Sequence, residues 1–233
     1  MGFIANLNKK IKHLINLNKL RVSYAIEGED LLIERALGHK NNGFFVDVGA
    51  YHPVKYSNTY RFYLKGWKGI NIDAMPGSMD LFKKKRPKDI NLEIPVADVS
   101  AILTYYIFNE QALNTFSEEE AKKKDGKGDI RLLRTEKLQT KRLEEILDRH
   151  VKPGTEIDFM SVDVEGYDLK VLQSNNWIKY KPALVLVENL VSYNTLEKAL
   201  HGEISLYMKS LGYNLFAKTY NTLFFEDEKK HLF

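Results

Sequence analysis

Short, strongly apolar runs alternate with longer amphipathic stretches over most of this chain. Runs of this kind are typical of strands in a parallel sheet, because helices cover both faces of such a sheet. The alternation of strand-like and helix-like segments therefore predicts an α/β fold. The runs expected to be strands ahead of the C-terminal segment are Phe44–Val48, Gly69–Ile72, Asn91–Val96, Leu103–Phe108, Ile157–Val162 and Ala183–Val187.

The amphipathic stretches repeat apolar residues at the spacing of a helix with one buried side. They are residues 29–37, 58–65, 138–150, 167–173 and 195–211. Gly38 and Gly212 directly follow the first and the last of them, where a glycine ends a helix well. After the last helix, Tyr213–Ala217 and Asn221–Phe225 predict a closing pair of strands.

The N-terminal residues are expected to form a separate small unit. Residues 3–17 carry an apolar stripe at helical spacing, with lysines on the opposite side. Such a helix could pack on the domain, contact a second copy of the chain, or lie on a membrane surface. Because the stripe has no tryptophan, packing or a homodimer contact is favoured. We expect residues 1–40 to form a helical appendage and residues 41–233 to form one domain.

One segment does not follow the alternation of strands and helices. Residues 109–137 are polar and contain Glu118–Glu120, Lys122–Lys124 and a glycine-containing turn. We interpret them as an insertion into the domain, close to the edge of the sheet at which the parallel strands end.

The composition limits the cellular compartments and the classes of binding partner that can be expected. The chain has 233 residues, a net charge of +4 and no cysteine. The lack of cysteine excludes disulfides and thiolate metal sites and favours a reducing compartment, so we expect the cytoplasm. No apolar run approaches the ~20 residues of a membrane-spanning helix, and the first residues lack the apolar core of a signal peptide. The modest charge and the lack of a recognisable binding module argue against a nucleic-acid partner.

The turn after the first predicted strand carries the most specific chemistry. Asp47 lies in that strand, and Gly49-Ala50 open a turn that also holds a tyrosine, a histidine and a proline. A pyrophosphate site would need a glycine-rich turn with free backbone N–H groups, so a dinucleotide is not favoured. Asp73 ends the second predicted strand, at the distance where an acid binds ribose hydroxyls. S-adenosylmethionine, which has a ribose, a sulfonium and an amino group but no phosphate, suits both acids.

A resemblance to a known family rests on segments in a fixed order: VDVGAYHP, SNT, GWKGINIDAMP, DFMSVDVEGYDLKVL and PALVLVE. Over about residues 43–190 the chain resembles the FkbM-type S-adenosylmethionine-dependent methyltransferases. The resemblance implies a Rossmann-like class I methyltransferase fold, with a mostly parallel sheet of seven strands, a C-terminal antiparallel hairpin and flanking helices. It also implies O-methylation, most often of a sugar or a glycosylated metabolite. The turn AYHP departs from the DVGANxG pattern of many members, which bears on the substrate more than on the cofactor.

The same resemblance assigns cofactor contacts. Asp47, Gly49 and Ala50 would line the methionine end of the cofactor, with Tyr51 in the same turn, and Asp73 would bind the ribose. Asp98, expected at the tip of the third strand, would receive the adenine amino group. Acids at such positions also cap helices and form turns, which is the alternative for Asp73 and Asp98.

Three polar residues lie at the start of the helix expected over 58–65. Ser57, Asn58 and Thr59 could cap this helix, or one of them could hold the cofactor carboxylate at its N-terminus.

Methyl transfer to a hydroxyl requires an in-line approach and benefits from a base that removes the hydroxyl proton. His52, Asp163 and Glu165 are the catalytic candidates, because each is expected at the carboxyl edge of the sheet; Glu188 qualifies by position too. His52 could instead shape its turn, and Glu165 could accept hydrogen bonds from loop amides. The acids could alternatively bind Mg²⁺ through oxygen ligands. Their spacing permits a divalent metal without requiring one, and we assign none.

The sequence thus predicts an O-methyltransferase for a sugar hydroxyl in bacterial polysaccharide synthesis, such as that of a capsule, or in glycoconjugate synthesis. A nucleotide sugar is one acceptor form, whose phosphates would meet basic residues of the insertion. Among the aromatic residues that could stack on the sugar, Tyr51 is favoured, because it flanks His52 on an exposed turn. Two other classes stay open: a nicotinamide-dependent sugar oxidoreductase or epimerase, and a non-catalytic module that acts through its N-terminal helix. The first would need the absent glycine-rich turn. An RNA methyltransferase would need a dominant basic face or an added domain.

Overall fold

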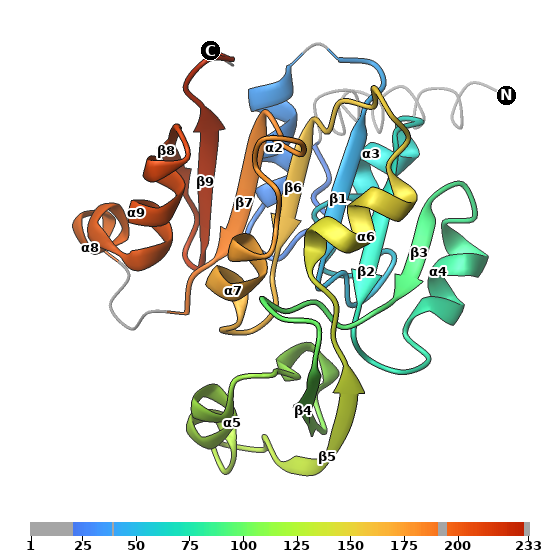
Figure 1. Cartoon of the computed structure of the whole chain (residues 1–233), viewed down its shortest axis with the longest axis vertical. Helices are drawn as coiled ribbons and strands as arrows, with labels where there is room; N and C mark the ends of the chain where they lie inside the picture. Colours follow the sequence, from blue (N-terminus) through green and yellow to red (C-terminus); the bar gives the residue numbers. More distant parts are fainter. Residues whose placement is uncertain (1–20, 39, 191–194, 231–233) are drawn as a thin grey trace, which may run out of the picture.

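The computed structural model of this chain describes residues 21–38, 40–190 and 195–230. Its centre is a sheet of seven strands with helices on both faces, and a smaller two-stranded sheet lies beyond one edge (Figure 1). Within the described ranges, no helix has the length and the apolar character needed to cross a membrane. The apolar stripe predicted over residues 3–17 lies outside the described residues.

Parallel pairing joins the strands at the centre of the sheet. β1 (Phe44–Val48) lies between β2 (Lys68–Asp73) and β6 (Phe159–Val162) and pairs in parallel with both. β2 also pairs with β3 (Ile90–Glu93), and β6 with β7 (Leu184–Glu188), again in parallel. The carboxyl ends of these strands therefore meet at one edge of the sheet, which is where ligands bind in such folds.

The last two strands close the sheet as an antiparallel pair. β8 (Tyr213–Lys218) and β9 (Thr222–Asp227) form a hairpin, and β9 pairs antiparallel with β7. The order across the sheet is β3-β2-β1-β6-β7-β9-β8. The predicted mostly parallel sheet of seven strands with a C-terminal antiparallel hairpin is confirmed.

Helices cover both faces because successive side chains of a strand point to opposite sides. On one face, Phe45 packs with Ile33 of α2 (Glu29–Leu37) and with Phe62 of α3 (Tyr60–Leu64). α2 has the bounds that the sequence predicts, and it belongs to the core of this face.

The opposite face has its own apolar core. Val46 and Met160 lie there, under α6 (Leu143–His150), α7 (Asp168–Gln173) and α9 (Glu203–Ser210). Because neighbouring residues of one strand serve the two cores, the almost continuous apolar runs of the sequence reflect burial on both sides.

Two helical features differ from the sequence pattern. The single helix expected over 195–211 is wrong, since α8 (Leu196–His201) and α9 are separated at Gly202, whose backbone is extended. Glycine is a weak helix former, which makes it a natural breaking point. The pattern also misses α4 (Met79–Lys85), a short helix after β2 with a lysine-rich last turn.

The segment interpreted as an insertion projects from the sheet. β4 (Ile102–Phe108) and β5 (Leu132–Gln139) form an antiparallel pair outside the main sheet, and η2 (Gln111–Leu113) and α5 (Glu118–Lys124) lie between them. Figure 1 shows this group beyond the carboxyl ends of the central strands. It therefore stands over the edge at which the site residues were predicted.

Two boundaries near this segment differ from the prediction. β3 ends at Glu93 rather than at Val96, because Pro95 has no N–H to extend the ladder. Asp98 consequently does not lie at the tip of a strand of the main sheet. The helix expected from residue 138 begins at Leu143, because the preceding polar residues belong to β5.

Candidate active site

A cavity of about 270 Å³ opens at the carboxyl edge of the sheet. The loops that follow β1, β2, β3 and β6 form most of its wall, and the insertion closes the remaining side. The lining residues include Gly49, Tyr51, His52, Asp73, Met75, Leu81, Ile94, Val96, Tyr105, Asn114, Phe116, Asp163 and Glu165.

The turn after β1 is held against its two neighbouring strands. The N–H groups of Gly49 and Ala50 donate to the carbonyl oxygen of Ile72, at 2.9 and 3.0 Å. Gly49 has φ +85°, and a Cβ atom at this position would stand 1.6 Å from the carbonyl oxygen of Asp163. Only glycine fits here, because both the backbone angle and the close approach of β6 exclude a side chain.

Asp73 connects two of the loops that line the cavity. Its Oδ2 accepts the N–H of Tyr51 and its Oδ1 accepts the N–H of Met75, each at 2.8 Å. Burial raises the pKa of Asp73, and these hydrogen bonds offset part of that rise. A carboxylate in this position can still accept hydrogen bonds from a ligand, because each carboxylate oxygen has two acceptor sites.

Asp47 lies beneath the cavity rather than in its wall. The hydroxyl of Thr59 donates to Asp47 Oδ2 at 2.7 Å and accepts from Nη1 of Arg86 at 2.9 Å. Arg86 also donates from Nε to Asp89 at 2.8 Å, and both Thr59 and Arg86 are fully buried. Burial raises the pKa of Asp47 to about 6. The structure thus gives Asp47 an internal hydrogen-bond network that sequence reasoning missed.

The polar residues before α3 also point away from the cavity. Ser57 Oγ accepts the N–H of Tyr60 at 3.0 Å, which caps the start of the helix. Asn58 donates to the hydroxyl of Ser161 at 3.0 Å. Neither of these residues lines the cavity, and the same holds for Thr59 and Asp98.

Of the predicted cofactor residues, the cavity wall therefore brings together Gly49, Tyr51 and Asp73. Ala50 lies in the same turn, with its side chain in a small apolar cluster with Met79 and Phe82. The carbonyl oxygen of Asp98 accepts a hydrogen bond from Arg142, away from the cavity.

The His52 ring is tied to its own turn. Its Nδ1 accepts the N–H groups of Val54 and Lys55, at 3.1 and 2.8 Å. Burial lowers the pKa of His52, which favours the neutral ring. A neutral ring that accepts at Nδ1 carries its proton on Nε2. His52 thus shapes the turn, as the sequence allowed, and has an N–H rather than a lone pair left for the cavity.

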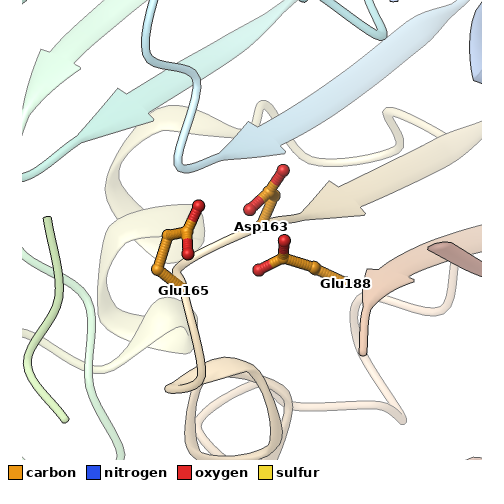
Figure 2. A group of neighbouring side chains, drawn as sticks. All are labelled: Asp163, Glu165 and Glu188. Carbon is orange, nitrogen blue, oxygen red and sulfur yellow. The ribbon is translucent and has the colours of Figure 1, made fainter. Parts of the chain in front are cut away.

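Three carboxyl groups converge where β6 and β7 end. Asp163 and Glu165 follow β6 and Glu188 ends β7, and one oxygen from each lies within 4.8 Å of the others. Figure 2 shows the three side chains turned toward a common space. Burial and repulsion from neighbouring acids raise the pKa of Asp163 and of Glu188, and a hydrogen bond from Glu188 to Asp163 favours the ionised form of Asp163. Burial also raises the pKa of Glu165, and Lys124 offsets part of that rise.

The insertion fixes the loop that carries Glu165. This residue has φ +56°, its side chain pairs with Lys124 of α5, and its carbonyl oxygen accepts from Thr115 at 2.8 Å. Asp168 accepts the N–H of Gly166 at 2.9 Å, and burial raises the pKa of Asp168 to about 7. The position of Glu165 therefore depends on α5.

Two further cavity residues are Asn114 of the insertion, which had no signal in the sequence, and Tyr105 of β4. Asn114 accepts the N–H of Phe108 at 2.8 Å and faces the sulfur of Met75. Tyr105 is buried in the wall, against the ring of Phe116. Trp67, in contrast, is a core residue next to Phe62.

The cavity suits an adenosine-type cofactor without phosphate. Ile94 and Val96 give it an apolar wall near Asp73, as a base next to a ribose requires. Asp163 and Glu165 give it an acidic side, which suits an amino group and a sulfonium. A cavity of this kind at the carboxyl edge of a Rossmann-like sheet fits the class of S-adenosylmethionine-dependent methyltransferases.

Residues 47–215, more than half of the chain, match the family described as the Methyltransferase FkbM domain, and the chain belongs to this family. No curated protein matches the chain. A solved structure that is similar is the TehB-like SAM-dependent methyltransferase from Corynebacterium glutamicum ATCC 13032 Kitasato, at a TM-score of 0.41 and 10% identity. The alignment covers 96% of this chain and 98% of that chain.

Proposed function

We propose that this methyltransferase transfers the methyl group of S-adenosylmethionine to a hydroxyl group of a sugar. One observation carries the proposal. Ionisable carboxyl groups, Asp163 and Glu165, line the same cavity as the turn at Gly49 and the ribose candidate Asp73. A group able to accept a hydroxyl proton would therefore lie beside the methyl donor if the donor binds in this cavity.

The cofactor would be held by three parts of the wall. Asp73 would accept hydrogen bonds from the ribose, Ile94 and Val96 would contact the adenine, and the turn at Gly49 would leave room for the methionine part. When bound, S-adenosylmethionine supplies a methyl group on a positively charged sulfur. The nearby carboxylates favour the binding of this positive charge.

Asp163 is the favoured proton acceptor. Its raised pKa makes it a stronger base than an exposed aspartate, and the hydrogen bond from Glu188 supports its ionised form. Asp163 would accept the proton of the acceptor hydroxyl as its oxygen receives the methyl group, which S-adenosylmethionine would supply when bound, leaving as the neutral thioether. Glu165 lines the same wall, and His52 can donate from Nε2 to an acceptor oxygen.

Aromatic side chains at the cavity support a sugar as the acceptor. Tyr51 lines the cavity, and its ring is nearly parallel to that of Tyr56, at 14° and 6.3 Å between centroids. Tyr56 does not line the cavity and has Lys55 Nζ 4.3 Å from its ring centroid, so Tyr51 is the ring that would meet a ligand. Flat aromatic faces pack well on the apolar faces of sugar rings.

A nucleotide sugar as the acceptor has less support than a sugar in general. Lys122 and Lys123 pair with glutamates of their own helix, and Lys124 pairs with Glu165. These lysines are therefore already engaged, and a role in binding phosphates stays a prediction. Action in the cytoplasm and in polysaccharide synthesis likewise rests on the sequence.

A transfer assay with methyl-labelled S-adenosylmethionine tests the proposal. The acceptors would be nucleotide sugars, free oligosaccharides, a phenol and an RNA oligonucleotide. We expect label on a sugar hydroxyl, with kcat at least ~100-fold lower in Asp163→Asn and unchanged in Asp148→Asn, whose side chain is half exposed. Transfer to the phenol or the RNA alone would contradict a sugar acceptor, and an unchanged kcat in Asp163→Asn would contradict the assigned base.

A further inference from the structure

One oxygen of the acidic cluster has no partner. Glu188 is only 9% exposed, yet its Oε2 has no hydrogen-bond partner among the residues that the structure describes. A buried carboxylate oxygen without a partner is costly, because it has lost water and gained nothing in exchange. This oxygen belongs to a side chain that turns toward Asp163 and Glu165 (Figure 2).

The positive charge around the acidic cluster is too small to balance the negative charge of its three carboxylates. Lys124 pairs with Glu165 and is the cation that contacts these three acids within the described chain. Asp168 and Asp47 lie near enough to Asp163 to add further negative charge. Buried carboxyl groups that protein cations do not balance hold protons, as in the hydrogen bond from Glu188 to Asp163, unless a bound metal ion displaces those protons.

From this geometry we infer that Asp163, Glu165 and Glu188 bind a divalent cation of the Mg²⁺ or Mn²⁺ type. Their three ligand oxygens lie within 4.8 Å of one another. Oxygens bound to one Mg²⁺ at ~2.1 Å stand roughly 3 to 4 Å apart, so small side-chain rotations suffice. Ligand atoms that are all carboxylate oxygens suit hard cations such as Mg²⁺ and Mn²⁺.

The cation would stand beside the cofactor turn. The carbonyl oxygen of Asp163 packs directly on Gly49, and Asp163 and Glu165 both line the cavity. A role in methyl transfer rests on the proposed function: the cation would bind the acceptor hydroxyl oxygen and lower its pKa. One oxygen of Asp163 would bind the cation, and the other would remain available for the hydroxyl proton.

Mn²⁺ binding to the full chain, followed by electron paramagnetic resonance after removal of metals with EDTA, tests this site. We expect a single Mn²⁺ per chain, displaced by Mg²⁺, and a rise in Tm when Mn²⁺ is added. Glu188→Gln keeps the shape of the side chain and should weaken Mn²⁺ binding by at least ~10-fold. Asp163→Asn serves as a second variant at the site, and Asp80→Asn, on an exposed residue of α4, is the matched control.

Absence of Mn²⁺ binding to the folded chain would overturn the inference. So would equal affinity in the wild type, in Glu188→Gln and in Asp163→Asn, because the bound ion would then lie elsewhere. A parallel titration with S-adenosylhomocysteine separates this inference from the proposed function. Binding of the nucleoside without Mn²⁺ would remove only the cation site, and binding of Mn²⁺ without the nucleoside would remove only the methyl-transfer site.

Discussion

The carbonyl oxygen of Asp163 occupies the place that a side chain on Gly49 would need, 1.6 Å from the position of a Cβ atom. This approach joins the turn after β1, where the cofactor is expected, to the loop that carries the candidate base. The two halves of the site therefore meet at this backbone contact.

The first prediction concerns this contact. Gly49→Ala should destabilise the fold by more than the ~1–3 kcal/mol cost of a left-handed residue alone, because the new methyl group also meets Asp163. Gly154→Ala is the matched control, since Gly154 has φ +81° and nothing within 4 Å of its Cβ position. Urea unfolding of both variants measures the difference. Equal losses of stability would show that the contact with Asp163 does not constrain Gly49.

The second prediction uses the buried carboxyl group of Asp47. Its pKa is raised to about 6 by burial, from an ordinary value of 3.8. The folded state then holds a proton more tightly than the unfolded chain, so ionisation as the pH rises through this range costs stability. Relative to Asp47→Asn, the wild type should lose on the order of 2–3 kcal/mol of unfolding free energy between about pH 4 and pH 7.

Unfolding of the wild type and Asp47→Asn by urea at a series of pH values measures this loss. Comparison with the variant removes the contribution of every other titrating group that both proteins share. A difference between the two proteins that stays constant with pH would contradict a raised pKa for Asp47.

The third prediction separates a role of His52 in shaping its turn from a role in contacting the acceptor. An asparagine side chain can accept backbone N–H groups within its own turn, as Nδ1 of His52 does. His52→Asn should therefore keep the wild-type Tm, whereas His52→Ala should lose ~1 kcal/mol of stability. Steady-state kinetics of the same variants would then show whether the Nε2–H group of His52 contributes to catalysis. If His52 only shapes the turn, His52→Asn keeps kcat within a few-fold; a loss as large as in His52→Ala would favour direct contact with the acceptor.

The fourth prediction compares two lysines of α5. Lys124 and Glu165 have side chains that are only 12% and 14% exposed, while Lys122 is 73% exposed. Removing one partner of a buried pair costs ~3–5 kcal/mol, and an exposed pair contributes ~0–1 kcal/mol. Lys124→Met should therefore be several times more destabilising than Lys122→Met in chemical unfolding. Similar losses in both variants would mean that the contact between α5 and Glu165 does not hold the loop.

The sheet and one half of the site could be predicted from the sequence because they depend on local patterns. Apolar runs marked the strands, and the acids that end them, Asp73 and Asp163, line the cavity together. Gly49 was recognisable because the turn needs a residue without a side chain.

The other half of the site depends on contacts between parts of the chain that are distant in sequence, and these contacts leave no local pattern. Arg86, which reaches Asp47 through Thr59, lies in a lysine-rich stretch that gives no hint of burial. Asn114 and Tyr105 line the cavity only because the insertion folds back over the sheet edge. Asp98 was placed at a strand tip by extending β3 past Pro95, which ends the ladder.

Calorimetric titration of the purified chain with S-adenosylhomocysteine tests the central claim most directly. We predict micromolar binding to the wild type and to Asp80→Asn, loss of binding in Asp73→Ala, and no binding of NAD. Thermal melting of each variant shows that the protein titrated is folded. If the folded wild type does not bind S-adenosylhomocysteine, or if Asp73→Ala binds it as tightly, the cavity at the carboxyl edge is not the methyl-donor site.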